Sequence, residues 1–135
     1  MIVRRDEKVR LISRVPLFAE CSQAELARIA AIATQVELPR GEVLLKQGER
    51  ADDFFVLVKG SADVRRGKAH LGTLKAGDFA GEIALLSDTP RTATVTTTSP
   101  VTALRATRKG FSELLKSFYM ARTGIELEHK EKVEV

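Results

Sequence analysis

An acid and an arginine flank a short polar turn in the stretch GEIALLSDTPRTATV, residues 81–95. The carboxylate of Glu82 can accept hydrogen bonds from sugar hydroxyls, and the guanidinium of Arg91 matches two phosphate oxygens geometrically. Gly81 has no side chain, so a ligand can approach its backbone closely. These residues together predict a site for a compact ligand with one negative charge and one or two hydroxyls, such as a cyclic sugar phosphate.

The sequence EIALL, which follows the glycine, can form one helical turn at this site. The first backbone amides of a helix lack partners within the helix and attract anions. Ala84 is small, Pro90 fixes φ directly before the arginine, and Thr92 adds a hydroxyl and an amide. The alternative is a plain ion pair between the acid and the arginine across a surface turn, which would contribute little stability.

Three regions of the chain differ in their patterns. Residues 3–34 have helical spacing, and Ser22 and Glu25 form the capping-box pattern of a helix start. Residues 36–106 consist of short apolar or alternating runs separated by glycines, which predicts a compact antiparallel sandwich or barrel. Within this region the sequence RRGK at 65–68 is a predicted hairpin tip, whose charges need no role beyond solvation. Pro16 is expected to end a first short helix, because a proline disfavours helix at the residue before it.

The third region, about residues 108–131, begins with helical spacing and continues into a tail of mixed charge. Gly124 interrupts its helical pattern, at a cost of up to about 1 kcal/mol relative to alanine. We expect one domain over residues 1–135, because a chain of this length suits a single core.

Composition and charge favour a globular protein of the cytoplasm. The net charge is +4, but the basic residues are scattered and often stand beside acids, and no alternation of basic and aromatic residues provides a surface for nucleic acid. No apolar stretch is long enough to span a bilayer, and the N-terminus does not have the pattern of a secretory signal. Cys21 is the single cysteine, which excludes an intramolecular disulfide and a thiolate-only metal site.

The stretch 81–93 resembles the phosphate-binding cassette of the cyclic nucleotide-binding domain family. That pattern reads Gly-Glu-aliphatic-Ala-Leu, a few residues, then Pro-Arg-small-Ala, and it is filled here by Gly81, Glu82, Ile83, Ala84, Leu85, Pro90, Arg91, Thr92 and Ala93. VPLFAECSQAEL, PRGEVLLKQGE, FFVLVKGSADV and LKAGDF resemble the family's helical entry, first strands and approach to the cassette. The resemblance covers roughly residues 9–118 and implies a mainly β fold, an eight-stranded antiparallel β-roll (jelly roll) with flanking N- and C-terminal helices.

The resemblance also implies which residues contact the nucleotide. The residues carried over are Gly81, Glu82, Ile83, Ala84, Arg91, Thr92, Ala93, Val58 and Leu71. Glu82 would accept from the ribose 2′-hydroxyl, and Arg91 would pair with the cyclic phosphate. The C-terminal helix, which in the family often closes over the base, supplies the lid candidates Tyr119 and Arg122. Ala80 departs from the family, which often has Phe directly before the cassette glycine; here Phe79 stands one place earlier.

The function implied by the resemblance is a regulatory domain that binds cAMP or cGMP and transmits binding through its C-terminal helices. Thr92 stands where family members that favour cGMP often carry Thr, but relatives with Ser or Thr there also bind cAMP, which we favour. The expected partners are the nucleotide and a separate or fused effector domain, and an oligomer is compatible with the sequence. We expect no cofactor, no metal and no direct contact with nucleic acid.

Two other readings of the chain are open. The chain could be a protein-interaction module that keeps the fold but has lost the nucleotide, or the receptor fragment of a larger transcription factor, channel or signalling enzyme. An enzyme is not expected, because catalysis by a nucleophile needs a base and an orienting group beside it. Both histidines, His70 and His129, are expected to be isolated.

Overall fold

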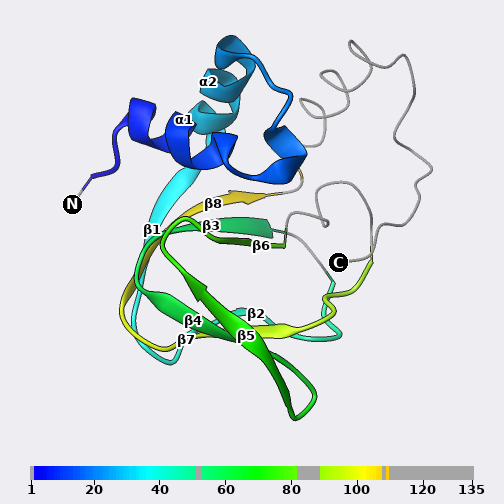
Figure 1. Ribbon diagram of the computed structural model, residues 1–135. Coiled ribbons are helices and arrows are strands. Elements are labelled where there is room, and N and C mark those ends of the chain that lie inside the picture. Colours follow the sequence, from blue (N-terminus) through cyan, green and yellow to red (C-terminus); the bar gives the residue numbers. More distant parts are fainter. Residues whose placement is uncertain (1, 51–52, 82–88, 108, 110–135) are drawn as a thin grey trace.

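The computed structural model describes residues 2–50, 53–81, 89–107 and 109, which form two antiparallel sheets and a helical layer (Figure 1). The helices are α1 (Arg5–Ser13), the 3₁₀ turn η1 (Pro16–Phe18) and α2 (Gln23–Ile32). The strands are β1 (Thr34–Leu38), β2 (Val43–Leu45), β3 (Asp53–Lys59), β4 (Ser61–Arg66), β5 (Ala69–Lys75), β6 (Phe79–Ala80), β7 (Thr94–Thr97) and β8 (Val101–Thr107). None of the helices in these ranges is long and apolar enough to cross a membrane.

The strand order is β1-β8-β3-β6 in the first sheet and β2-β7-β4-β5 in the second. Figure 1 shows the helical layer over the first sheet, with the second sheet on the other side. The predicted β-roll with N-terminal helices is confirmed, and the first strand begins at Thr34, slightly before the expected start at 36. Apart from Lys109, the predicted C-terminal helices at about 108–131 lie outside the described residues.

The end of the first helix and the start of the second lie where the sequence predicts. Pro16 leaves Val15 extended, with ψ at 124°, so the first helix ends before it and the proline starts η1. At the start of α2, the Ser22 hydroxyl accepts from the Glu25 amide at 3.1 Å, and the Glu25 carboxylate accepts from the Ser22 amide at 2.8 Å. The predicted capping box is therefore confirmed.

The central strands of the first sheet, β3 and β8, are buried on both faces and divide the interior into two cores. The helix-side core is made by Val3, Leu11, Ile12, Val15, Phe18, Leu26, Ile29, Ala30, Ala33, Phe54, Val56, Leu104 and Ala106. The inter-sheet core is made by Leu45, Phe55, Leu57, Ala62, Ala80, Val95, Val101 and Ala103. Successive β3 side chains point to opposite faces, so Phe54 enters the first core and Phe55 the second. This double burial fixes the register of β3, whose first residue belongs to the site described below.

A hydrogen-bonded network on β1 ties the N-terminal segment to the first sheet. The buried hydroxyl of Thr102 on β8 donates to Glu37 Oε1 at 2.7 Å, and Gln35 Nε2 donates to Glu37 Oε2 at 2.8 Å. Gln35 Oε1 accepts from the amide of Val3 at 2.6 Å. The bonds from Gln35 and Thr102 stabilise the charged carboxylate and lower the pKa of Glu37 from its ordinary value of 4.5.

We predict that Glu37→Gln lowers the free energy of unfolding at neutral pH. The native pKa of Glu37 is depressed, so its stabilising contribution is complete above pH 4.5 and is lost as the pH falls through the native pKa. Urea titrations of both proteins from pH 7 to pH 3 should therefore show a difference that shrinks on acidification. Glu42→Gln, at an exposed glutamate, is the control. A difference independent of pH would contradict the network.

Candidate functional site

The structure brings Gly81 and Arg91 of the predicted cassette into direct contact. The Arg91 side chain is only 6% exposed, and its Nη2 donates to the backbone carbonyl of Asp53 at 2.6 Å and to Asp53 Oδ1 at 3.2 Å. Gly81 has φ at +87°, and a Cβ on it would lie 2.8 Å from both Arg91 Nη1 and the Asp53 carbonyl oxygen. A glycine is therefore required at 81 by backbone conformation and by space.

One carboxylate serves two arginines at this site. Asp53 Oδ2 accepts from Arg105 Nε on β8 at 2.7 Å, while Oδ1 faces Arg91. The side chains of Asp53, Arg91 and Arg105 together carry a formal charge of +1. The Arg91 charge is buried, and electrostatic interactions are stronger where water is excluded. The burial of this guanidinium is the feature from which a site for a small anion is proposed below.

The backbone around Arg91 is held by the loop between β2 and β3. The Arg91 amide donates to the Glu49 carbonyl at 2.8 Å, and the Gly48 amide donates to the Arg91 carbonyl at 2.9 Å. Pro90, directly before, forms an isolated antiparallel bridge with Arg50. These contacts place the guanidinium without relying on the flanking strand β7, which begins only at Thr94.

The strand that leads into Gly81 is anchored on both cores. In β6, Phe79 packs against the helix-side core and Ala80 belongs to the inter-sheet core. Both pair with β3, in the register Phe55 with Ala80 and Val56 with Phe79. Where the family often has Phe, Ala80 thus fills a buried position in the inter-sheet core. The aromatic ring of Phe79 lies on the opposite face of the sheet.

Several predicted site residues cannot be placed. Glu82, Ile83 and Ala84 of the cassette, and the lid candidates Tyr119 and Arg122, lie outside the described residues. Their roles stay predictions.

The remaining predicted residues have different surroundings. Thr92 is exposed and Ala93 is partly buried. Val58 packs against the helix-side core, on the face of β3 opposite Leu57, and Leu71 on β5 is 48% exposed. These positions do not by themselves show that Val58 or Leu71 lines a nucleotide pocket, and both assignments stay predictions.

Sequence reasoning missed Asp53 and Arg105. Neither belongs to the cassette, and they meet only because β3 pairs with β8 in the register Phe55 with Arg105. The one available signal was the position of Asp53 directly before the apolar run of β3, which marks the start of a buried strand.

The expectation that both histidines are isolated is wrong for His70. Its Nε2 lies 2.9 Å from Asp63 Oδ1 on the neighbouring strand β4, and Arg65 Nε lies 3.5 Å from the other oxygen of the same carboxylate. The two residues meet because β4 and β5 form a hairpin. Among the described residues, no group of three or more His, Cys, Asp or Glu side chains could hold a metal ion.

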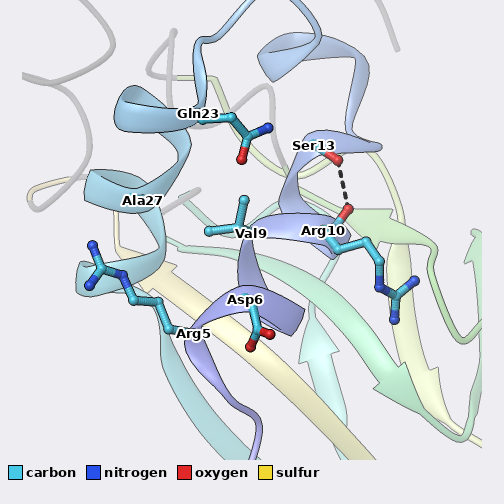
Figure 2. A pocket seen from close by; sticks show the side chains of 7 residues that line it. All are labelled: Arg5, Asp6, Val9, Arg10, Ser13, Gln23 and Ala27. Carbon is cyan, nitrogen blue, oxygen red and sulfur yellow. Dashed lines mark hydrogen bonds between the residues drawn. The ribbon is translucent and has the colours of Figure 1, made fainter.

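The helical layer carries a separate groove between α1 and α2 (Figure 2). It is lined by Arg5, Asp6, Val9, Arg10, Ser13, Gln23 and Ala27. The Ser13 hydroxyl donates to the Arg10 carbonyl at 2.7 Å, and the Arg10 guanidinium pairs with Glu7 at 2.8 Å. The groove shares no residue with the site around Arg91.

The sequence profile described as "Cyclic nucleotide-binding domain" matches residues 35–118. This match spans both sheets and includes the whole cassette, together with Asp53, Arg91 and Arg105. The chain therefore belongs to the cyclic nucleotide-binding domain family.

Similar proteins include regulatory subunits of a kinase. The cAMP-dependent protein kinase regulatory subunit of Mycosarcoma maydis is 43% identical over 96 residues, which are 68% of this chain and 18% of that protein. The corresponding subunit of Emericella nidulans is 33% identical over 114 residues, 83% of this chain and 28% of that protein. The chain thus spans less than a third of the length of these relatives, and both are regulatory subunits.

Solved structures agree on the fold. The cyclic nucleotide-binding-like protein of Brucella abortus superposes with a TM-score of 0.74 at 24% identity, over 82% of this chain and 98% of that chain. The cAMP-bound PfPKA-R superposes with a TM-score of 0.72 at 26% identity, over 87% of this chain and 43% of that chain.

We predict that Gly81→Ala destabilises the protein more than Gly41→Ala does. Gly41 has nearly the same φ, +86°, but a Cβ there would meet nothing within 4 Å. The loss at Gly41 should be about 1–2 kcal/mol, from backbone conformation alone. At Gly81 the contact with the Asp53 carbonyl adds to this loss, because backbone cannot move aside cheaply. Urea unfolding measures both, and equal losses would contradict the close contact at Gly81.

Proposed function

We propose that this chain is a regulatory domain that binds a cyclic nucleotide, cAMP in the first place and cGMP as the alternative, at the site around Arg91. The observation that carries the proposal is the guanidinium of Arg91, which is buried against the backbone of Gly81 and shares the Asp53 carboxylate with Arg105. Its surroundings favour an anion that fits close to a bare backbone, and a cyclic phosphodiester carries one negative charge on a compact ring. The matching family profile and the kinase regulatory relatives support the choice of a nucleotide.

The chemistry of binding follows from the groups present. The phosphate would take charge-assisted bonds from Arg91, and the sugar would lie beside Gly81, where no side chain obstructs it. Glu82 is proposed to accept from the ribose hydroxyl, and Thr92 to contact the phosphate or the base. Since the guanidinium already donates to Asp53, an incoming phosphate competes with that carboxylate or joins it in the same network.

Regulation would use the neighbouring strand. Asp53 contacts both Arg91 and Arg105, and Arg105 lies near the end of β8, after which the C-terminal region begins. A phosphate that draws Arg91 away from Asp53 would therefore alter the charges facing β8. A ligand shifts an equilibrium only through different affinities for the two states, so this rearrangement is the proposed source of the difference. The partner would be an effector domain, on a separate chain or in the same one.

We predict that the chain binds cAMP and that Arg91→Ala weakens binding by about 2–5 kcal/mol, because the phosphate loses a desolvated charged partner. Isothermal titration with cAMP and cGMP measures both proteins. Arg40→Ala removes the same charge from the exposed β1–β2 turn and should bind like the wild type. Thermal unfolding must show that each variant is folded.

Equal and weak heats from wild type and Arg91→Ala would contradict the proposal. They would favour the interaction module that keeps the fold without the ligand.

We also predict that the nucleotide is bound without being hydrolysed, since the relatives are regulatory subunits. Chromatography of cAMP after prolonged incubation with the protein should recover the cyclic nucleotide unchanged. Turnover that is abolished in Arg91→Ala would overturn the assignment as a receptor.

A further inference from the structure

The tip of the β4–β5 hairpin contacts the segment that carries Arg91. Arg66 Nε, at the end of β4, donates to the backbone carbonyl of Thr92 at 3.0 Å. The amide of Gly67, at the tip, donates to the side chain of Gln47 at 2.7 Å. The sequence alone gave the charges of this tip no role beyond solvation, but one of them is bonded to the cassette.

Gln47 connects the tip to the same segment a second time. The backbone amide of Gln47 donates to Thr94 Oγ1 at 2.9 Å. The next residues of its loop, Gly48 and Glu49, make the two backbone bonds to Arg91 described above. Five hydrogen bonds thus connect three segments of the chain, residues 47–49, 66–67 and 91–94. We call these three bonded segments the three-segment clamp.

The three-segment clamp holds the backbone of residues 91–92, which lies outside the ladder hydrogen bonds of the sheet. The ladder between β4 and β7 ends with the pair Arg65 and Thr94, and the ladder between β2 and β7 ends at Leu45. Thr92 therefore lies beyond the last ladder pair on the side of Arg91. The side chain of Arg66 continues the connection from β4 where the backbone ladder stops.

We propose that Arg66 and Gln47 are positioning residues for the anion site. They hold the backbone of residues 91–92 in one conformation, so that the guanidinium and the Thr92 amide are in place before the ligand arrives. Without them the segment would have to be ordered on binding, and that ordering lowers the affinity. The inference rests on the proposed function, because it concerns the affinity for the same nucleotide.

The neighbouring arginine provides a control for charge. Arg65 carries the same charge one residue earlier, but its guanidinium lies 3.5 Å from the Asp63 carboxylate and is not part of the clamp. Arg65→Gln and Arg66→Gln therefore remove equal charge from the same hairpin, and they differ in the bond to Thr92. Arg66→Lys keeps the charge and a donor, and it should restore part of the affinity.

The test is titration of cAMP into wild type and variants, with amide hydrogen exchange as a second readout. Arg66→Gln and Gln47→Ala should each weaken binding about threefold to tenfold, the effect of one hydrogen bond. Arg65→Gln should stay within about twofold of the wild type. In Arg66→Gln the Arg91 amide should exchange faster, and in Arg65→Gln its exchange should not change.

The outcomes separate this inference from the proposed function. A wild type that binds no cyclic nucleotide contradicts the proposed function, and the inference falls with it. A wild type that binds, together with Arg66→Gln and Gln47→Ala variants that bind equally well, overturns the inference alone. Equal losses in Arg65→Gln and Arg66→Gln also overturn it, because the effect would then be one of charge. If Arg66→Gln does not fold, Gln47→Ala decides with the same two readouts.

Discussion

A guanidinium that is almost fully withdrawn from water needs partners close by, and the structure around Arg91 is organised by that need. The backbone carbonyl and the carboxylate of Asp53 supply partners, and the missing side chain at Gly81 makes the space for them. The carboxylate is shared with Arg105, so it cannot neutralise both arginines. A guanidinium held beside a bare backbone can form strong charge-assisted bonds with a compact anion, and this is the physical basis of the proposed site.

The scaffold determines where these charges lie. Asp53 begins β3, which is held between the helix-side core and the inter-sheet core, and Arg105 lies on the adjacent strand of the same sheet. Gly81 directly follows β6, which pairs with the other edge of β3. Slippage of β3 by one residue would exchange its buried faces and separate Asp53 from both arginines. The packing of two cores on one strand therefore also maintains the geometry of the site.

The sequence predicted the features that depend on neighbours along the chain. The capping box at Ser22, the helix end before Pro16 and the hairpin tip at 65–68 are local, and all three are confirmed. Asp53, Arg105 and the bonds of Arg66 were missed because they depend on which strands pair and in which register. His70 was misjudged for the same reason, since its partner Asp63 comes from the other strand of a hairpin. Within the cassette, the proximity of Gly81 to Arg91 was the part of the site that residue types and spacing could indicate.

The most direct measurement is a crystal structure of the protein with bound cAMP. We expect the exocyclic phosphate oxygens to lie within hydrogen-bonding distance of the Arg91 guanidinium, with the sugar against the backbone of Gly81. Nucleotide density elsewhere, such as in the groove between α1 and α2, with Arg91 bonded to Asp53 alone, would contradict it.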